Sequence, residues 1–369
     1  MRILITGQEG FIGYHLSNNI QFNYPDYQIL DYNKSFFNSE PELTNSISNS
    51  DIIIHLAGVN RTDNEQVLYD TNLELTKKLL KSIHNAKFNG KLIFASSTQE
   101  SDNNMYGKSK KDSRLLFEEA SNEMGFSYST LVIPNVYGPF CKPNFNSFIS
   151  TFSKNIICEN DINIIKNNKV KLIFVNSLIE VFISNFNKKS ENIHVKPEIE
   201  ISVSEVKKIL EKFKNDYIIK GIIPNLDSKF KTNLFITFLS YIEYESFYPK
   251  NYEINYDERG SFSELVRTKV KGQLSYSKTL PGVIRGNHFH TRKIERFSVI
   301  QGKAKIEIRK IGSNKKFSFE IDGNNPAYID MPVWHTHNIK NIGTDELITI
   351  FWINEFYDKH DADTFYEKV

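Results

Sequence analysis

The chain has 369 residues, which exceeds one ordinary hydrophobic core and favours two domains. Its 46 basic and 44 acidic residues nearly cancel, so no overall field would hold the protein on nucleic acid or on an anionic membrane. No run approaches the ~20 apolar residues of a membrane span, no signal peptide is recognisable, and Cys141 and Cys158 are too few for a disulfide framework. We therefore expect a cytoplasmic protein that neither inserts into a membrane nor binds nucleic acid. Its expected partner is a small molecule.

A strand, a glycine-rich turn and a helix are predicted at the start of the chain. Residues 2–6 form a short apolar run, and Gly7, Gly10 and Gly13 follow it at the onset of a helical apolar period. Glycine permits a tight turn and a close backbone approach to a pyrophosphate, whose charge then lies at the positive end of the helix. The spacing is a GxxGxxG variant, and a purely structural turn is the alternative.

Further strands alternate with helical stretches. Apolar runs predict strands at residues 27–30, 51–56 and 91–95, and a helical period covers residues 72–84. This alternation predicts an α/β Rossmann-type fold with a doubly wound parallel sheet. Asp31 ends the second strand, where a ribose-binding acid is expected, while Lys34 just beyond could pair with a 2′-phosphate. We expect NADPH as the cofactor, with NADH as the alternative.

A hydroxyl, a tyrosine and a lysine follow the fourth predicted strand. Ser97 lies in a Ser-Ser-Thr cluster with Thr98 as its alternative, and Tyr106 and Lys110 are four positions apart, so they share a face of a helix. The ammonium would lower the pKa of the tyrosine, which could then act as an acid or base while Ser97 holds a substrate oxygen. An exposed tyrosine beside a solvated lysine is the alternative, and the upstream glycines argue against it.

Residues 1–138 resemble the extended short-chain dehydrogenase/reductase family, which acts on nucleotide-sugars. The segments GQEGFIG, IIHLAGVN, FASST, YGKSK and PNVYG stand where that family has its motifs. The resemblance implies that the three glycines bind pyrophosphate, that Ser97, Tyr106 and Lys110 are catalytic, that Tyr106 and Lys110 also meet the cofactor, and that Asn135 meets the substrate.

The chain departs from the pattern of this family in two places. The loop between Ser97 and Tyr106 is short, and Thr98-Gln99-Glu100 stands where family dehydratases have an Asp-Glu pair, so ketone reduction fits better than dehydration.

A change of pattern predicts a second, all-β domain. Signals from about residue 155 to 247 are mixed, and this stretch is expected to complete the first domain as a substrate lobe. We place domains at residues 1–247 and 248–369. Beyond the boundary, short strands alternate with turns at residues 257–260, 281–282, 301–302 and 323–326. That density of turns predicts an all-β barrel or sandwich.

Four residues of the second domain have the chemistry of a metal centre. His288 and His290 alternate on a predicted strand, Glu295 follows closely, and His337 comes from a later strand. Three imidazoles and a carboxylate suit zinc, iron, manganese, nickel or copper, and we take zinc as the expected ion. A structural histidine and a solvated glutamate are the alternatives for the single residues.

The spacing resembles the cupin family, so we expect a cupin barrel. Gly282, the two histidines, Glu295 and Gly302 match its first motif, and Pro332, His337 and Asn341 match its second, whereas Trp334 replaces a usual glycine. Residues 257–264 and 282–288 also resemble cupin-fold sugar-nucleotide epimerases. This resemblance implies diphosphate contacts for Arg259 and Arg285. A metal-bound His288 cannot also be a free base, so we expect the ion to polarise the ketone and His335 to move the proton.

Together the two parts resemble bifunctional enzymes of capsular-polysaccharide synthesis. The resemblance implies a UDP-linked 4-keto-6-deoxy-N-acetylhexosamine as substrate, C3 epimerisation by the cupin, and then NADPH-dependent C4 reduction to UDP-2-acetamido-2,6-dideoxy-L-talose, in a homodimer joined through the cupin domains. Three alternatives remain: a reductase with a non-catalytic binding or dimerising cupin, oxidative chemistry at the ion, and an epimerase or dehydratase that retains NAD.

Overall fold

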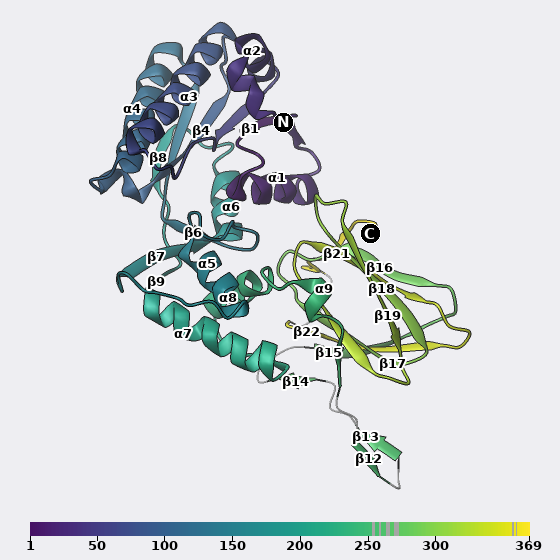
Figure 1. Cartoon of the computed structure of the whole chain (residues 1–369). Coiled ribbons are helices and arrows are strands. Elements are labelled where there is room, and N and C mark those ends of the chain that lie inside the picture. The colour runs from purple at the N-terminus through teal and green to yellow at the C-terminus, as the bar shows by residue number, and fades with distance from the viewer. Residues whose placement is uncertain (253–254, 258–259, 263–265, 269–272, 356–357, 359) are drawn as a thin grey trace. The chain divides into compact units, whose positions relative to one another are not determined.

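The computed structural model describes the chain apart from residues 253–254, 258–259, 263–265, 269–272, 356–357 and 359 (grey in Figure 1). The chain forms two compact units. Unit 1 contains Met1–Thr151 and Ile164–Val203, and unit 2 contains Phe152–Asn163 and Ser204–Val369. Residues 204–247 are thus grouped with the β strands that follow them. The domain boundary at 247/248 stays a prediction.

Unit 1 is built on a parallel sheet of six strands. Their bounds are β1 (Arg2–Thr6), β2 (Gln28–Ile29), β3 (Ile52–His55), β4 (Lys91–Ser97), β5 (Ser127–Ile133) and β8 (Glu191–His194). The order is β2-β1-β3-β4-β5-β8, and every neighbouring pair is parallel. The four predicted strands are all present, and β4 extends two residues further than expected, so that it includes Ser97.

Helices cover both faces of this sheet. Their bounds are α1 (Phe11–Asn23), α2 (Glu40–Ser48), α3 (Glu65–Asn85), α4 (Met105–Met124) and α6 (Val175–Ser184), with the 3₁₀ helices η1 (Lys34–Asn38) and η2 (Thr98–Ser101). Figure 1 shows α3 and α4 on one face and α1 and α6 on the other. Buried side chains such as Leu4, Leu79 and Phe117 fill the α3/α4 face. The sheet is therefore doubly wound, with helices on each face as parallel strands require.

Smaller elements complete unit 1 and lead into unit 2. A three-stranded sheet has the order β6 (Asn135–Tyr137), β7 (Lys169–Phe174) and β9 (Ile199–Ser202). The helices α5 (Phe148–Ile157) and α7 (Val203–Phe213) run across the division between the units. The mixed signals that the sequence gives for this region correspond to a real mixture of short strands and helices.

The helical part of unit 2 consists of η3 (Lys214–Ile219), α8 (Lys229–Leu239) and α9 (Tyr244–Phe247). It is tied to the strands of the same unit by a buried polar network. Arg296 Nε lies 2.7 Å from Asp330 Oδ1, the hydroxyl of Tyr217 donates to Asp330, and the hydroxyl of Tyr248 lies 2.9 Å from that of Tyr217. Because of these contacts, the helical part and the strands form one compact unit.

The strands of unit 2 form two larger antiparallel sheets. One contains β11 (Lys250–Asn251), β20 (Ala327–Met331), β17 (Glu295–Gln301), β22 (Leu347–Ile353) and β15 (Gln273–Thr279), in that order. The other contains β19 (Lys316–Asp322), β18 (Lys303–Lys310), β21 (His335–Asn341), β16 (Ile284–Phe289) and β23 (Phe365–Tyr366), in that order. Short pairs join β12 (Asn255–Asp257) to β13 (Gly260–Phe262) and β10 (Ile222–Ile223) to β14 (Arg267–Thr268).

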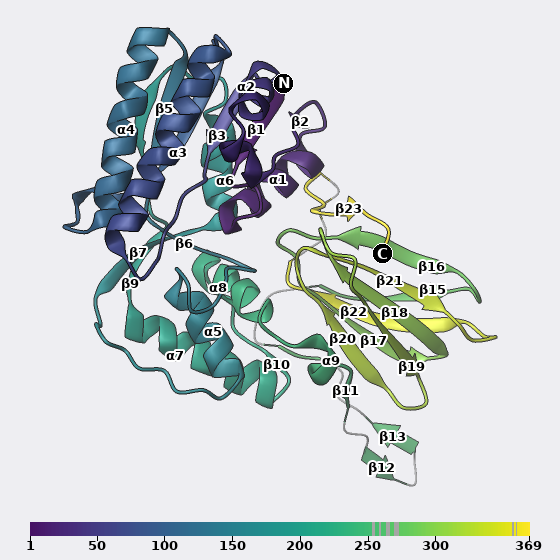
Figure 2. The same cartoon turned by 45° about the horizontal axis from the view of Figure 1, so that its top comes forward.

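The two larger sheets enclose one apolar core (Figure 2). Val299 and Ile329 from the first sheet pack with Ile306 and Ile339 from the second. The period-2 alternation of β18 agrees with this arrangement, since its buried residues are Ala304, Ile306 and Ile308. The predicted class, a Rossmann-type α/β sheet followed by an all-β region, is confirmed. Among the residues that the structure describes, no helix has the length and apolar character needed to cross a bilayer.

Candidate active sites

The glycine-rich loop after β1 has the geometry of a phosphate cradle. Gly7 has φ +78°, and a Cβ atom there would lie 2.8 Å from the Ala57 amide nitrogen. A Cβ atom on Gly13 would lie 2.2 Å from Gly7 O. Gly10 precedes the first turn of α1. The loop can hold this shape only with glycine at the two crowded positions, and it brings the N-terminus of α1 to the carboxyl edge of the sheet, where pyrophosphate binds in such folds.

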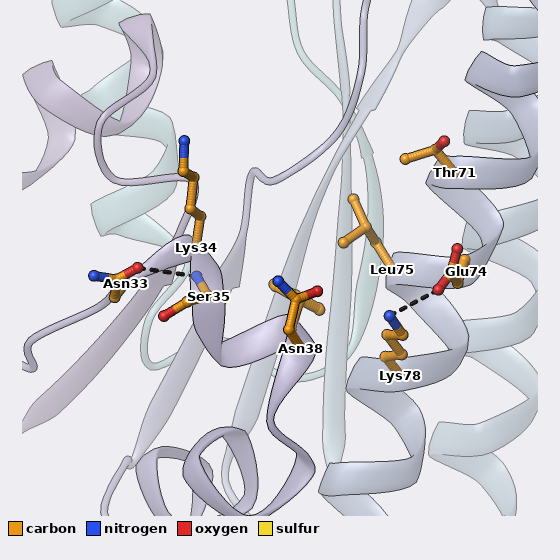
Figure 3. A pocket seen from close by; sticks show the side chains of 9 residues that line it. Asn33, Lys34, Ser35, Asn38, Thr71, Glu74, Leu75 and Lys78 are labelled. Carbon is orange, nitrogen blue, oxygen red and sulfur yellow. Dashed lines mark hydrogen bonds and ion pairs between the residues drawn. The ribbon is translucent and has the colours of Figure 1, made fainter.

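Asp31 and Lys34 lie at the next strand end. Both are exposed, Asp31 after β2 and Lys34 at the first residue of η1. Lys34 lines a cavity of about 380 Å³ between η1 and α3, together with Asn33, Asn38, Glu74, Lys78 and their neighbours (Figure 3). An acid suited to a ribose hydroxyl and a cation suited to a phosphate are therefore both present in this region, so the choice between the two dinucleotides stays a prediction.

Sequence reasoning missed Tyr32, which lies between those two residues. Burial raises the pKa of the Tyr32 hydroxyl, and the nearby backbone of Gly7 opposes this shift. This proximity links the strand end that carries Asp31 to the glycine loop. A tyrosine in a polar stretch gives no sign of such a contact, because the contact depends on how two distant turns meet.

Tyr106 and Lys110 share a face of α4, as the spacing predicts. The Lys110 ammonium lies 5.8 Å from the centroid of the Tyr106 ring and donates to Ala95 O on β4 at 3.0 Å. Burial lowers the pKa of Lys110 to about 8, an effect that Glu100 opposes. Ser97 ends β4, and its hydroxyl accepts from the Gln99 amide at 3.2 Å. All three side chains therefore belong to elements that meet at the carboxyl edge of the sheet.

The predicted direction of the Tyr106 pKa is wrong. Burial raises the pKa of the Tyr106 hydroxyl to about 12. The ammonium of Lys110, 5.8 Å from the centroid of the Tyr106 ring, does not offset this effect. Tyr106 is therefore protonated at neutral pH, the state needed by a group that gives a proton to a ketone oxygen.

Gly107 explains how so short a segment can join Ser97 to Tyr106. A Cβ atom on Gly107 would lie 1.8 Å from Gln99 O, so η2 packs directly against the first turn of α4. The Asn104 side chain caps the same turn by accepting from the Gly107 amide at 2.7 Å. The short loop of this chain is thus accommodated by close backbone packing.

Glu100 is engaged in an ion pair. Its carboxylate accepts from Arg114 Nε at 2.9 Å and from the hydroxyl of Ser96. Ser96 and Ser97 are successive strand residues and point to opposite faces of the sheet. This arrangement supports the expectation that Glu100 does not replace the acid pair of a dehydratase.

Two amides complete the description of unit 1. Asn72, missed by sequence reasoning, accepts from the Val59 amide at 2.7 Å and donates to Ser109 Oγ at 3.0 Å, so it joins the loop after β3 to α4. Asn135 is exposed at the start of β6 and donates to Lys171 O at 3.4 Å. Its contact with substrate stays a prediction.

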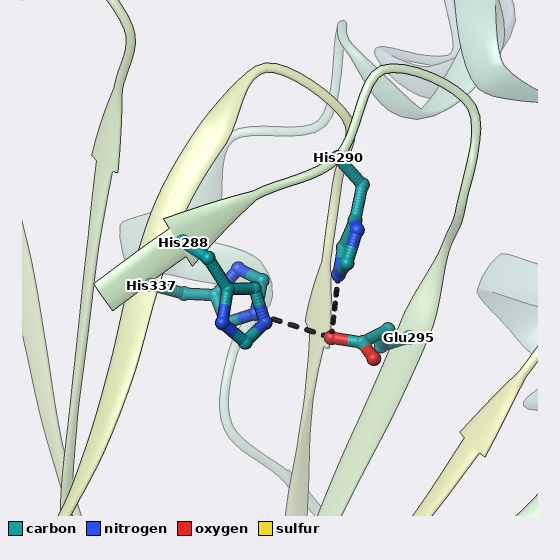
Figure 4. Close-up of side chains that lie close together, drawn as sticks. All are labelled: His288, His290, Glu295 and His337. Atoms are coloured by element: carbon teal, nitrogen blue, oxygen red, sulfur yellow. Dashed lines mark ion pairs between the residues drawn. The ribbon is translucent and has the colours of Figure 1, made fainter. Parts of the chain in front are cut away.

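The four predicted metal ligands lie together in unit 2 (Figure 4). One ligand atom from each of His288, His290, Glu295 and His337 falls within 4.8 Å of the others. Glu295 Oε2 lies 3.2 Å from His290 Nε2 and 3.1 Å from His337 Nε2. They come from β16, the residue just after it, the first residue of β17, and β21.

A β-bulge places His288. The pairing of β16 with β21 shifts between Gly286 and His288, where Gly286 has φ +93° and Asn287 has φ +56°. A Cβ atom on Gly286 would lie 2.8 Å from His337 O. Bulges turn a strand and re-aim its side chains, and this one is placed so that it can turn His288 toward the other three residues.

The donor atoms of the group suit a cation. Within the described part of the chain, no hydrogen bond is found for the buried atoms His290 Nε2, Glu295 Oε2 and His337 Nε2, which face one another instead. Burial lowers the pKa of His288 to about 4, whereas the contact with Glu295 raises the pKa of His290 against the effect of burial. Imidazole nitrogens and a carboxylate oxygen are donors that bind a divalent metal, and here they converge in a buried site, so these residues fit one.

The other predicted residues of unit 2 lie outside this group. His335 is buried, with Nδ1 2.9 Å from Val333 O and its ring 5.2 Å from that of Tyr244, and its pKa is lowered to about 4 by burial. Arg285 is exposed and donates to Lys278 O at 3.1 Å. Arg259 lies outside the described residues. The roles assigned to these three residues stay predictions.

Comparisons with known proteins agree with this division. Residues 3–195 match the NAD dependent epimerase/dehydratase family, and residues 255–365 match the polysaccharide biosynthesis C-terminal domain. The chain belongs to the NAD-dependent epimerase/dehydratase family. It is therefore of the NAD(P)-dependent nucleotide-sugar reductase or epimerase type.

Two relatives match the chain over nearly its full length. The chain is 32% identical to UDP-2-acetamido-2,6-beta-L-arabino-hexul-4-ose reductase of Pseudomonas aeruginosa, over 99% of this chain and 98% of that protein. It is similar to the crystal structure of the capsular polysaccharide assembling protein CapF from Staphylococcus aureus, with a TM-score of 0.63, 31% identity and 100% of both chains covered. The resemblance to enzymes of capsular-polysaccharide synthesis is therefore confirmed. The spore coat polysaccharide biosynthesis protein SpsL of Bacillus subtilis is 28% identical over 29% of this chain and 78% of that protein.

Proposed function

We propose that unit 1 reduces the C4 ketone of a UDP-linked 2-acetamido-2,6-dideoxy-hexulose. The observation that carries this proposal is the pair formed by a protonated Tyr106 and a buried Lys110, which contacts the strand that ends at Ser97. The chain is also similar over its full length to a hexul-4-ose reductase. A reduced nicotinamide supplies hydride when bound. Ser97 holds the ketone oxygen, Tyr106 gives that oxygen a proton, and Lys110 in its charged form favours the tyrosinate that remains. The product is an alcohol at C4.

The proposed cofactor is NADPH. Lys34 offers a cation near the expected ribose, and Asp31 offers an acceptor for an unmodified ribose, so the two residues favour different dinucleotides. Comparing kcat/KM for the two reduced cofactors decides between them. A large preference for NADH would overturn this part of the proposal.

For unit 2 we propose C3 epimerisation of the same keto sugar before reduction. A divalent ion, with zinc as the proposed one, held by His288, His290, Glu295 and His337 supplies positive charge that makes a proton beside a ketone more acidic. His335 is proposed to move that proton, and Arg259 and Arg285 to bind the diphosphate. Epimerisation must come first, because the C3 proton loses its acidity once the ketone is reduced. The product would be UDP-2-acetamido-2,6-dideoxy-L-talose, a precursor for capsule or surface polysaccharide.

The second candidate function makes unit 2 a binding or dimerising module. It is favoured by the burial of His335 and by the apolar surface at one end of the β strands, where Leu280, Val283, Ile284 and Ile342 are 63%, 43%, 49% and 40% exposed. The amide of Val283 donates to Leu280 O at 3.2 Å, which holds this turn together. We propose that these side chains join two copies in a homodimer. Sedimentation of Ile284→Glu tests this, and an unchanged mass would exclude this surface from the dimer.

The central experiment uses Tyr106→Phe, with the UDP-linked keto sugar in D2O and without NADPH. Because this variant cannot complete reduction, deuterium entering at C3 reports epimerisation alone. If a Glu295→Gln, Tyr106→Phe double variant loses this exchange, the epimerisation is assigned to the metal centre. Absence of exchange in folded, metal-loaded protein would leave a reductase with a non-catalytic second region. Oxygen consumption with the keto sugar, or NAD retained on purification, would favour the remaining alternatives.

A further inference from the structure

The C-terminal segment, residues 361–369, lies against the metal-ligand group. Its strand β23 pairs with β16, so that Tyr366 is opposite His288 and Phe365 is opposite Phe289. The Glu367 amide donates to Asn287 O in the bulge at 2.9 Å, and the hydroxyl of Thr336 donates to Glu367 O. The segment therefore contacts the strand of one proposed ligand and the bulge that orients it.

Asp363 makes the most extensive contacts of this segment. Its Oδ1 accepts from the Thr291 amide at 3.1 Å and from Thr291 Oγ1 at 2.6 Å, while its Oδ2 accepts from the amides of Arg292 at 2.9 Å and Lys293 at 3.0 Å. One carboxylate thus gathers three successive backbone amides of the loop between His290 and Glu295. Hydrogen bonds of this kind, with a charged acceptor, are about twice as strong as neutral ones.

The backbone of Asp363 contacts a proposed ligand directly. Its carbonyl oxygen lies 2.5 Å from His290 Nδ1, and a carbonyl can only accept, so Nδ1 carries the proton. The proton-free Nε2 is then the atom that faces Glu295. Asp363 itself has φ +41°, and it is 6% exposed. The left-handed backbone conformation turns the carbonyl and the carboxylate of one buried residue toward the same loop.

We propose that Asp363 is a positioning residue of the metal centre, which fixes the tautomer of His290 through its carbonyl and the loop between His290 and Glu295 through its carboxylate. The proposal rests on the metal centre proposed above. Groups that orient a metal-bound histidine commonly change metal affinity when they are altered, even though they do not touch the ion. The sequence gives no sign of this role, because Asp363 lies 73 positions after His290.

Asp363→Asn is the decisive variant and Asp361→Asn its matched control. The asparagine keeps the size of the side chain but turns an NH2 group toward backbone amides, so one side of the loop loses its acceptor. Asp361 belongs to the same segment, is exposed, and pairs with Arg292 NH2 at 2.8 Å, and no hydrogen bond to a loop amide is recorded for its side chain among the described residues. Zinc affinity is measured by competition with a chromophoric chelator, and the visible spectrum of the cobalt-loaded protein reports the geometry around the ion.

We expect Asp363→Asn to weaken zinc binding by about 10- to 100-fold and to change the cobalt spectrum, while Asp361→Asn matches the unaltered protein. Thr291→Val, which removes one donor to Asp363, should show a smaller loss, and it decides the question if Asp363→Asn does not fold. Equal zinc affinity and equal cobalt spectra in Asp363→Asn and Asp361→Asn would overturn the inference. If Asp363→Asn does not fold, a Thr291→Val protein with the zinc affinity and cobalt spectrum of the unaltered protein would overturn it. If neither the unaltered protein nor Asp361→Asn holds zinc, the proposed metal centre itself is wrong.

Discussion

The indole ring of Trp334 stacks on the ring of Phe289, with centroids 5.5 Å apart, although the backbone of Trp334 has φ +57°. The sequence shows a tryptophan where the cupin resemblance implies a glycine, and the structure keeps the conformation that glycine would adopt. The Trp334 amide donates to His290 O at 2.8 Å, and its carbonyl accepts from Ile311 at 2.9 Å. Burial of the indole offsets the strain of the turn.

Trp334→Gly should therefore destabilise the protein. Relief of the left-handed conformation is worth about 1–2 kcal/mol, whereas loss of a buried tryptophan costs about 3–5 kcal/mol. A net loss of about 2 kcal/mol is expected in chemical unfolding. Trp334→Phe keeps an aromatic ring and should lose less. A Trp334→Gly protein more stable than the unaltered one would contradict this explanation.

Gly107→Ala should impair reduction through displacement of η2. The added Cβ would lie 1.8 Å from Gln99 O, so the segment that joins Ser97 to Tyr106 must move. A shift of about 1 Å near reacting groups can lower kcat by about 100-fold.

Gly125→Ala at the other end of α4 is the control. It has φ +79° and nothing within 4 Å of its added Cβ, so it should lose about 1 kcal/mol of stability and keep its kcat. Equal kcat in the two variants would show that the close packing at Gly107 does not matter for catalysis.

The rate of reduction should fall as the pH rises above about 8, where Lys110 loses its proton. Tyr106, with a pKa of about 12, stays protonated over this range. Lys110→Arg keeps a positive charge, and its residual activity should lose this alkaline limb. The pH profile of kcat/KM in both proteins checks the assignment, and an unchanged limb in Lys110→Arg would refute it.

The ionisation of Lys110 should affect stability in the opposite sense to activity: the free energy of unfolding should rise with pH in the range where the rate of reduction falls. The pKa of Lys110 is lowered in the folded protein from 10.5 to about 8, so the unfolded chain binds more protons between these values. Stability contributed at this position therefore rises with pH across that window. Lys110→Met should be more stable than the unaltered protein at neutral pH, and this difference should shrink toward pH 10.5. If the stability difference between Lys110→Met and the unaltered protein does not change with pH, the difference does not come from the ionisation of Lys110.

Zinc should raise the melting temperature of the chelator-treated protein. An ion that binds only the folded state adds about 2.7 kcal/mol at 100 times its Kd. Glu295→Gln should remove this response because it removes the carboxylate shared by His290 and His337. Glu307→Gln, which alters a partly exposed carboxylate on β18, is the control and should respond as the unaltered protein does. A response retained by Glu295→Gln would place the ion outside this group.

Asp330→Asn should destabilise unit 2 strongly. The side chains of Asp330 and Arg296 are 3% and 2% exposed, and removing one charge leaves the other buried, which costs about 3–5 kcal/mol. Asp322→Asn, in a more exposed ion pair with Lys303, should change stability by less than about 1 kcal/mol. Chemical unfolding of both variants measures the difference, and equal losses would show that the buried pair has no special weight.

The sequence by itself determined the local features of this protein. The glycine turn after residues 2–6, the alternation of strands and helices, the shared helix face of Tyr106 and Lys110, and the four-residue ligand set all follow from backbone stereochemistry and from the periods of helix and strand. These signals lie within short stretches of chain, so the printed residues are sufficient to reveal them.

The tertiary structure decided whatever depends on burial or on residues far apart. Burial sets the protonated state of Tyr106 against the predicted direction, and long-range packing engages Glu100 with Arg114. The contact of Asp363 with His290 likewise joins distant positions. A sequence pattern records spacing along the chain, whereas desolvation and hydrogen bonding depend on which surfaces meet after folding, and only the folded arrangement contains that information.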